Sequence, residues 1–103
     1  MDKITAIDAA RQYAQLVAQE LKPATILLFG SYAKNTVNSD SDIDVAVVFN
    51  GFDGDWLDTS ARLWRLRRDI SDNIEPILLD SSNDASGFIE NIFKTGEILY
   101  STQ

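Results

Sequence analysis

Two aspartates separated by a single residue, Asp42 and Asp44, are the side chains in this sequence best placed for chemistry. They open an apolar run, and a β-strand there would put both carboxylates on one face, about 6.6–7 Å apart. Burying a carboxylate without a partner is costly unless the group becomes protonated. Two carboxylates at this spacing can share one magnesium ion or bracket a pair of them. The pair therefore predicts an acidic site that binds a divalent cation.

A Gly-Ser pair, Gly30-Ser31, ends the preceding apolar run, and ten residues separate it from Asp42. Gly30 permits a close approach to the backbone. Ser31 offers a hydroxyl and a backbone N–H at the start of a helical turn, which suits a phosphate group. A third acid, Glu75, opens a later apolar run and could reach the same end of the sheet. Each feature alone is also explained as a turn, a solvated loop acid or a surface strand residue, so the prediction depends on their combination.

The composition narrows the chemistry, because the 103 residues include neither Cys nor His. Thiolate and imidazole metal ligands are excluded, and so is the commonest general base. Any metal must be held by oxygen, which favours magnesium or manganese. The net charge of −7 argues against nucleic acid as the main partner and is compatible with a basic protein partner.

The pattern of apolar residues indicates one domain over residues 1–103. We expect helices over residues 1–21, 56–70 and 84–95, and strands over residues 25–29, 43–49 and 74–79. This order, α-β-(turn)-β-α-β-α, predicts a small α/β (α+β) domain with a mixed sheet of three or more strands and about three helices. Pro76 favours an edge or a bulge for the third strand, and residues 98–100 form a short apolar tail that docks on the body.

The spacing of apolar residues also predicts which side of each helix faces the sheet. The predicted apolar face of the first helix consists of Ile4, Ile7, Ala10, Tyr13 or Ala14, Val17 and Leu21. That of the second consists of Leu57, Ala61, Trp64 and Leu66 or Arg68, and that of the third of Phe88, Ile92 and Phe93. Gly96 should end the third helix. No segment has the length of apolar sequence needed to span a membrane or the apolar region of a signal peptide, so we expect a cytoplasmic protein.

Residues 30–35, with the Gly-Ser pair, and residues 41–45, with the Asp-x-Asp pair, resemble the signature of the polymerase-β-type nucleotidyltransferase superfamily. The small size resembles the minimal nucleotidyltransferase branch, which is often paired with a HEPN-domain protein. Residues 74–79 and 88–100 are similar to the tail of such domains, so the resemblance covers about residues 25–100.

The resemblance implies a metal-dependent transfer of AMP from ATP to an acceptor hydroxyl. Asp42, Asp44 and Glu75 would be the catalytic acids and the ligands of two Mg²⁺ ions, with Mn²⁺ as an alternative, and Gly30 and Ser31 would hold the triphosphate. In HEPN-paired members the acceptor is a tyrosine of the partner toxin, so the chain would act as an antitoxin. Asn35 replaces the usual glycine, and Glu75 is often an aspartate in the family; neither change removes the site.

Other interpretations stay open at this point. The chain could be a non-catalytic antitoxin that neutralises its partner by contact, or it could transfer a nucleotide to a small molecule such as an aminoglycoside. A cluster of four arginines, Arg62, Arg65, Arg67 and Arg68, could bind phosphate or an acidic partner. Four arginines over seven helical positions cannot all face one way, however, which favours a solvated surface. The acceptor, the nucleobase and a possible homo-oligomer are left undetermined.

Overall fold

The computed structural model describes residues 3–30 and 42–102. These residues form three helices and one four-stranded sheet, which confirms the predicted small α+β fold. The elements in chain order are α1 (Lys3–Leu21), β1 (Thr25–Phe29), β2 (Ile43–Phe49), α2 (Trp56–Leu66), β3 (Ile74–Asp80), α3 (Phe88–Thr95) and β4 (Glu97–Ser101). Short 3₁₀ turns follow α2 (Arg67–Asp69) and β3 (Ser81–Asn83). The turn and loop predicted over residues 31–41 lie outside the described residues.

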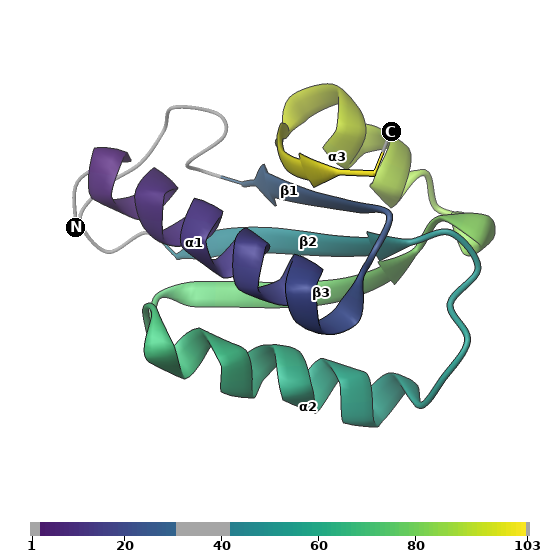
Figure 1. The fold of residues 1–103 in the computed structure, drawn as a ribbon. Coiled ribbons are helices and arrows are strands. Elements are labelled where there is room, and N and C mark those ends of the chain that lie inside the picture. Colours follow the sequence, from purple (N-terminus) through teal and green to yellow (C-terminus); the bar gives the residue numbers. More distant parts are fainter. Residues whose placement is uncertain (1–2, 31–41, 103) are drawn as a thin grey trace.

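The sheet has the strand order β3-β2-β1-β4 and is mixed (Figure 1). Antiparallel pairing joins β1 to β2 and β1 to β4, whereas β2 and β3 run parallel. Parallel neighbours need a long crossover connection, and α2 supplies it. Pro76 lacks an N–H for the ladder, and β3 does lie at the edge of the sheet as its proline predicts.

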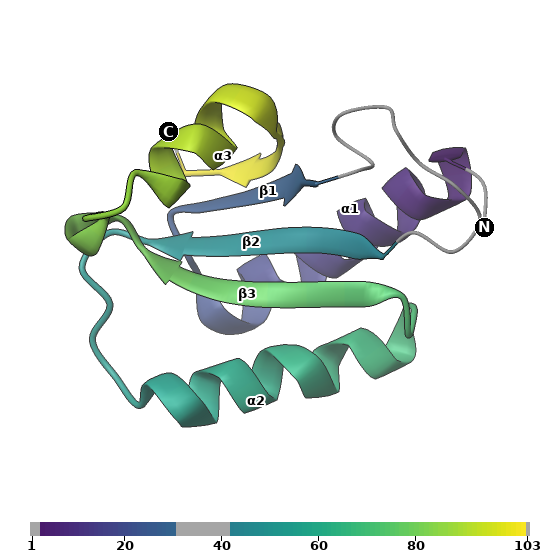
Figure 2. The same cartoon turned by 180° about the vertical axis from the view of Figure 1, so that it is seen from behind.

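Helices cover both faces of the sheet, and α1 and α2 share one of them. Their core includes Ile43, Val45 and Val47 of β2 together with Tyr13 and Leu63. The Tyr13 hydroxyl donates a hydrogen bond to the Leu63 carbonyl at 2.7 Å, which ties α1 to α2. Burial raises the pKa of this phenol, so it stays a neutral donor, although the nearby Arg67 acts in the opposite direction. Figure 2 shows α1 behind β1 and β2 in the view from behind.

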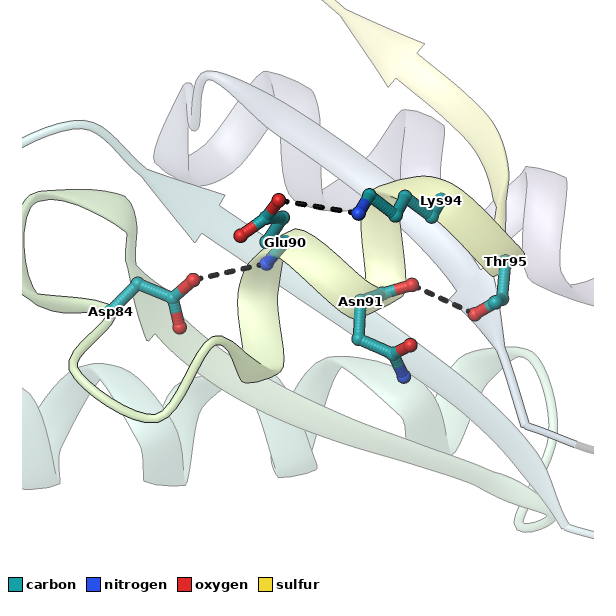
Figure 3. A network of polar contacts seen from close by, with 5 residues as sticks. All are labelled: Asp84, Glu90, Asn91, Lys94 and Thr95. Atoms are coloured by element: carbon teal, nitrogen blue, oxygen red, sulfur yellow. Dashed lines mark hydrogen bonds and ion pairs between the residues drawn. The ribbon is translucent and has the colours of Figure 1, made fainter.

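The other face carries α3, which packs over β1 and β2. Ile89 and Ile92, one turn apart, are 6% and 2% exposed and contact Leu27, Ala46 and Val48. The helix begins at Phe88, later than predicted, because Asp84 stays outside it. The carboxylate of Asp84 accepts hydrogen bonds from the N–H groups of Ile89 and Glu90. Figure 3 shows the bond from Glu90. The same figure shows the Glu90–Lys94 ion pair at 3.3 Å, one turn along the helix.

The predicted inward face of α1 is confirmed at Ala10, Tyr13 and Val17, which are buried, and Ile92 of α3 is buried as predicted. Several other residues predicted to face inward are exposed. Ile4 is 76% exposed, and Leu57 of α2 is 80% exposed. Trp64, Phe88 and Phe93 are each 41% exposed, so none of them lies in the core. In α2 the buried residue is Leu63, on the opposite side of the helix from Leu57. In α3 the isoleucines take the core positions, and the Phe88 ring instead meets the Phe29 ring edge-on at 6.2 Å.

The apolar tail predicted at residues 98–100 is a strand, β4, which extends the sheet beyond β1. Gly96 ends α3 as predicted, and the turn brings β4 directly against β1. A Cβ at this position would lie 2.7 Å from the Ile92 carbonyl oxygen and 2.8 Å from that of Leu28. Only glycine fits this close approach. Within the described residues, no helix has both the length and the apolar character to cross a bilayer.

Candidate active site

The structure brings two of the predicted acids together at one end of the sheet. Asp44 in β2 and Glu75 in β3 are paired in the parallel register, so their side chains project from the same face of neighbouring strands. Strands in a sheet are about 4.8 Å apart, which sets the separation of the two backbones here. Asp42 directly precedes β2, is exposed, and shares the parity of Asp44. The three acids come from two segments that α2 separates in the sequence.

Burial and like charge both disfavour the ionised form of Asp44. The pKa of its carboxyl is raised, first by burial and then by the negative charges of Glu75 and Asp42. The ion pairs in the described residues involve other acids, namely Glu20 and Glu90. Asp44 is therefore a half-buried carboxylate whose charged neighbours have the same sign as its own.

Gly30 lies against this carboxylate at the end of β1. Its φ of +75° is in the left-handed region, which favours glycine. A Cβ on Gly30 would lie 2.2 Å from Oδ2 of Asp44, so the space beside the backbone is already filled by the acid. The end of β1 therefore lies directly beside Asp44. Ser31, the predicted phosphate ligand, lies outside the described residues.

The donor chemistry of this cluster fits a divalent cation. Three carboxylates offer the oxygen ligands that Mg²⁺ and Mn²⁺ prefer, and a cation would relieve the repulsion that raises the pKa of Asp44. In the part of the chain that the structure describes, no three acidic side chains form a ready-made metal site. Glu75 is exposed, and the ion would require its side chain to turn toward Asp44.

A cavity that was not predicted from the sequence lies at the opposite end of β3. Its volume is about 440 Å³, and its lining includes Trp56, Leu79, Asp80, Asp84 and Phe88. Both of its acids already have structural roles. Asp84 accepts a hydrogen bond from a backbone N–H at the start of α3. Asp80 accepts hydrogen bonds from the N–H groups of Gly51 and Phe52 at 2.9 and 3.0 Å. The candidate site is therefore the acidic end of the sheet, not this cavity.

A small mixed sheet with two acids on neighbouring parallel strands, beside a glycine turn, defines the class of nucleotidyltransferase-like domains. The sequence matches the Polbeta family (Polymerase beta, Nucleotidyltransferase) over residues 11–103. The chain belongs to this family, which confirms the resemblance seen in the sequence.

Solved structures share the fold at low sequence identity. A Sulfolobus solfataricus protein, provisionally assigned as a nucleotidyltransferase, superposes with a TM-score of 0.73 and 22% identity, covering 97% of this chain and 84% of its own. A toxin–antitoxin structure with AMP-PNP gives a TM-score of 0.62 and 22% identity, covering 90% and 74% of the two chains. A mutant of the toxin–antitoxin MntA-HpeT gives 0.53 and 20%, covering 100% and 76%. No curated protein matches the sequence significantly.

Proposed function

We propose that this protein is a metal-dependent nucleotidyltransferase that moves AMP from ATP to a tyrosine hydroxyl of a HEPN-type toxin partner and thereby acts as an antitoxin. The observation that carries the proposal is Asp44, which lies against Gly30, pairs in register with Glu75 and is repelled by the charges of Glu75 and Asp42. Membership of the Polbeta family supports the reaction class. The required ATP fits the cytoplasmic location expected from the sequence.

Each acid has a role in the proposed site. Asp42, Asp44 and Glu75 would hold the magnesium ions, with Asp44 as the central ligand because it contacts the turn at Gly30 and pairs with Glu75 in the register. The metal would supply positive charge that stabilises the phosphate oxygens in the transition state. The backbone of Gly30, which lies against Asp44, and the hydroxyl and N–H of Ser31 would hold the triphosphate beside the acids.

The chemical step is an in-line displacement at the α-phosphorus of ATP. The oxygen of the acceptor hydroxyl forms a new bond to that phosphorus, and its proton passes to the carboxylate of Glu75. The bond from the α-phosphorus to the bridging oxygen breaks, and pyrophosphate leaves with the electron pair. Glu75 suits the proton-accepting role because it is exposed, whereas Asp44 is half-buried.

The partner proposal is supported by the structural neighbours. Two of the similar structures are toxin–antitoxin assemblies, and one of them was solved with AMP-PNP, an ATP analogue. The described residues form a small domain that offers little surface to enclose an acceptor. If the acceptor hydroxyl belongs to a protein partner, residues of that partner would complete the enclosure of the site.

A labelling assay tests the proposal. The purified protein is incubated with Mg²⁺, ATP labelled on the α-phosphate and the protein encoded by the neighbouring gene. We expect label on a tyrosine of that protein with wild type and none with the double variant Asp42→Ala/Asp44→Ala. The control Asp8→Ala/Asp53→Ala, which removes two exposed acids elsewhere, should transfer label normally.

The other outcomes separate the alternatives. An intact complex without label would support an antitoxin that acts by contact alone. Label on an added aminoglycoside, and none on the protein, would support a small-molecule acceptor. Label that persists in Asp42→Ala/Asp44→Ala would contradict the assignment of these acids.

A further inference from the structure

The outer side of α2 carries apolar side chains where a solvated helix would carry polar ones. Leu57, Ala61 and Trp64 follow one another at helical spacing and lie along one side of α2. Leu57 is 80% exposed and Trp64 is 41% exposed, whereas Leu63 on the opposite side is buried in the core. We call Leu57, Ala61 and Trp64 the outer stripe of α2. Contiguous exposed apolar residues with a polar rim commonly mark interaction sites.

The four arginines of this segment divide into two pairs. Arg62 forms an ion pair with Glu20 at 2.8 Å. Arg67 donates hydrogen bonds to the carbonyl oxygens of Asp72 and Ile74, the latter at 3.2 Å. Arg65 and Arg68 are exposed beside the outer stripe and form no ion pair within residues 3–30 and 42–102. Two cations therefore remain available in a chain whose net charge is −7.

Arg67 packs on the indole ring of Trp64 and restricts its motion. Its guanidinium lies 4.7 Å from the centroid of the indole ring, and its hydrogen bonds to backbone carbonyls fix its position. A tryptophan held in this way loses little side-chain freedom on binding. Tryptophan and arginine are also enriched among the residues that contribute most to protein interfaces.

The outer stripe runs along α2 toward the end of the sheet that carries the acids. Asp44 and Glu75 project from the other face of the sheet, because they alternate with Ile43 and Ile74 of the core beneath α1 and α2. Figure 1 shows α2 running opposite to β3, with its last turn at the end where β3 begins. The 3₁₀ turn Arg67–Asp69 leads from that end into β3, where Glu75 is the second residue. A partner lying on Trp64 and Arg68 is thus at the end of the molecule that carries the acids.

We propose that the outer stripe of α2, with Arg65 and Arg68, is the docking surface for a segment of the acceptor protein that presents acidic side chains around apolar ones. This inference rests on the proposed function and names the surface by which the acceptor protein is held. Charge complementarity selects the acidic partner. A second copy of the chain would bring the same two arginines together across a two-fold axis. Nucleic acid is disfavoured by the net charge and by the exposed leucine.

The experiment compares two matched double variants in binding to the protein encoded by the neighbouring gene. Leu57→Ser/Arg65→Glu alters the docking surface. Ile4→Ser/Arg11→Glu makes the same chemical changes at exposed positions of α1, where Ile4 is 76% exposed. We expect the α2 variant to bind at least about tenfold more weakly by isothermal titration calorimetry. The α1 variant and Asp42→Ala/Asp44→Ala should bind like wild type.

Thermal unfolding and a labelling assay make the result decisive. All variants should melt within a few degrees of wild type, and Arg68→Glu alone provides a second test if Leu57→Ser/Arg65→Glu does not fold. Equal binding by both double variants, or no binding by wild type, would overturn the docking proposal. So would an α2 variant that loses affinity only for a single-stranded RNA oligonucleotide. If Leu57→Ser/Arg65→Glu binds more weakly but wild type transfers no label to any protein, the docking surface is supported and the proposed function is contradicted. If that variant binds like wild type and wild type transfers label, the proposed function is supported and the docking surface is contradicted.

Discussion

The two ends of the β2–β3 pair hold carboxylates in opposite situations. At the start of the strands, the pKa of Asp44 is raised by burial and by the charges of Glu75 and Asp42. At the far end, Asp80 accepts hydrogen bonds from two groups of Ser82 and from the N–H groups of Phe52 and Gly51. These bonds, that of the Ser82 hydroxyl first, lower its pKa from 3.8 to about 2.

The difference distinguishes an acid with a structural role, Asp80, from Asp44, the acid that we propose as a metal ligand. The negative charge of Asp80 is already satisfied by donors of its own chain, so it stabilises the loop after β2. The negative charge of Asp44 is close to those of Glu75 and Asp42, and this repulsion destabilises the folded state. A bound cation would turn the repulsion into attraction. Paired changes at the two ends test this distinction.

The largest expected difference comes from removing one charge at each end. Asp44→Asn should reduce nucleotide transfer at least about a hundredfold, because it removes a proposed metal ligand. Asp80→Asn should lower the melting temperature by several degrees and leave transfer by the folded protein unchanged. Labelling with α-phosphate-labelled ATP and thermal unfolding of both variants provide the two measurements. A large loss of transfer in Asp80→Asn at a temperature where it is folded would contradict the comparison.

Magnesium should stabilise the protein through the acidic end alone. A ligand that binds only the folded state at a concentration of 100 times its Kd raises the free energy of unfolding by about 2.7 kcal/mol. We expect such a rise in wild type and in Asp80→Asn when Mg²⁺ and ATP are added. Asp44→Asn should show little rise, and it should already be at least as stable as wild type without metal because the repulsion is reduced. Chemical unfolding with and without Mg²⁺ measures the effect.

Two glycines offer the same comparison in the backbone. Gly30 and Gly87 share a φ of +75°, but a Cβ would meet Asp44 at Gly30 and no heavy atom within 4 Å at Gly87. Gly87→Ala should therefore show only the cost of the left-handed conformation, about 1–2 kcal/mol. Gly30→Ala should cost more, because the carboxylate of Asp44 must move, and it should also impair transfer at least about tenfold. Equal destabilisation and normal transfer in both variants would contradict this prediction. It would show that the Asp44 carboxylate can move without a loss of stability or of nucleotide transfer.

The smallest effect is the dependence of stability on acid. The pKa of Asp80 is lowered in the folded state, so its contribution is present above pH 3.8 and is lost as the pH falls toward 2. The pKa of Asp44 is raised, so protonation of this group favours the folded state as the pH falls. In urea unfolding between pH 5 and 2, Asp80→Asn should flatten the loss of stability at low pH. Asp44→Asn should leave that loss in place.

The sequence predicted the strands of the site because their signals are local. Alternation puts Asp42 and Asp44 on one face, and Pro76 restricts β3 to an edge. The side of α2 that is buried could not be predicted in this way, because apolar residues occur on both sides of that helix. The Leu63 side chain is buried in a cluster with Tyr13 and strand residues that are distant in the sequence. The fourth strand was missed for a similar reason, since residues 97–101 become a strand by pairing with β1.

The parallel register of Asp44 and Glu75 also has a consequence for the synthesis of the protein. The ribosome makes Asp42 and Asp44 first, and Glu75 follows only after the whole of α2 has been translated. At about 5–20 residues per second, a nascent chain has an incomplete acidic cluster for a few seconds. The non-local pairing of β2 with β3 must then form before the three acids can act together. The pairing of Asp44 with Glu75 therefore forms only when β3 joins the sheet, after α2 has been made.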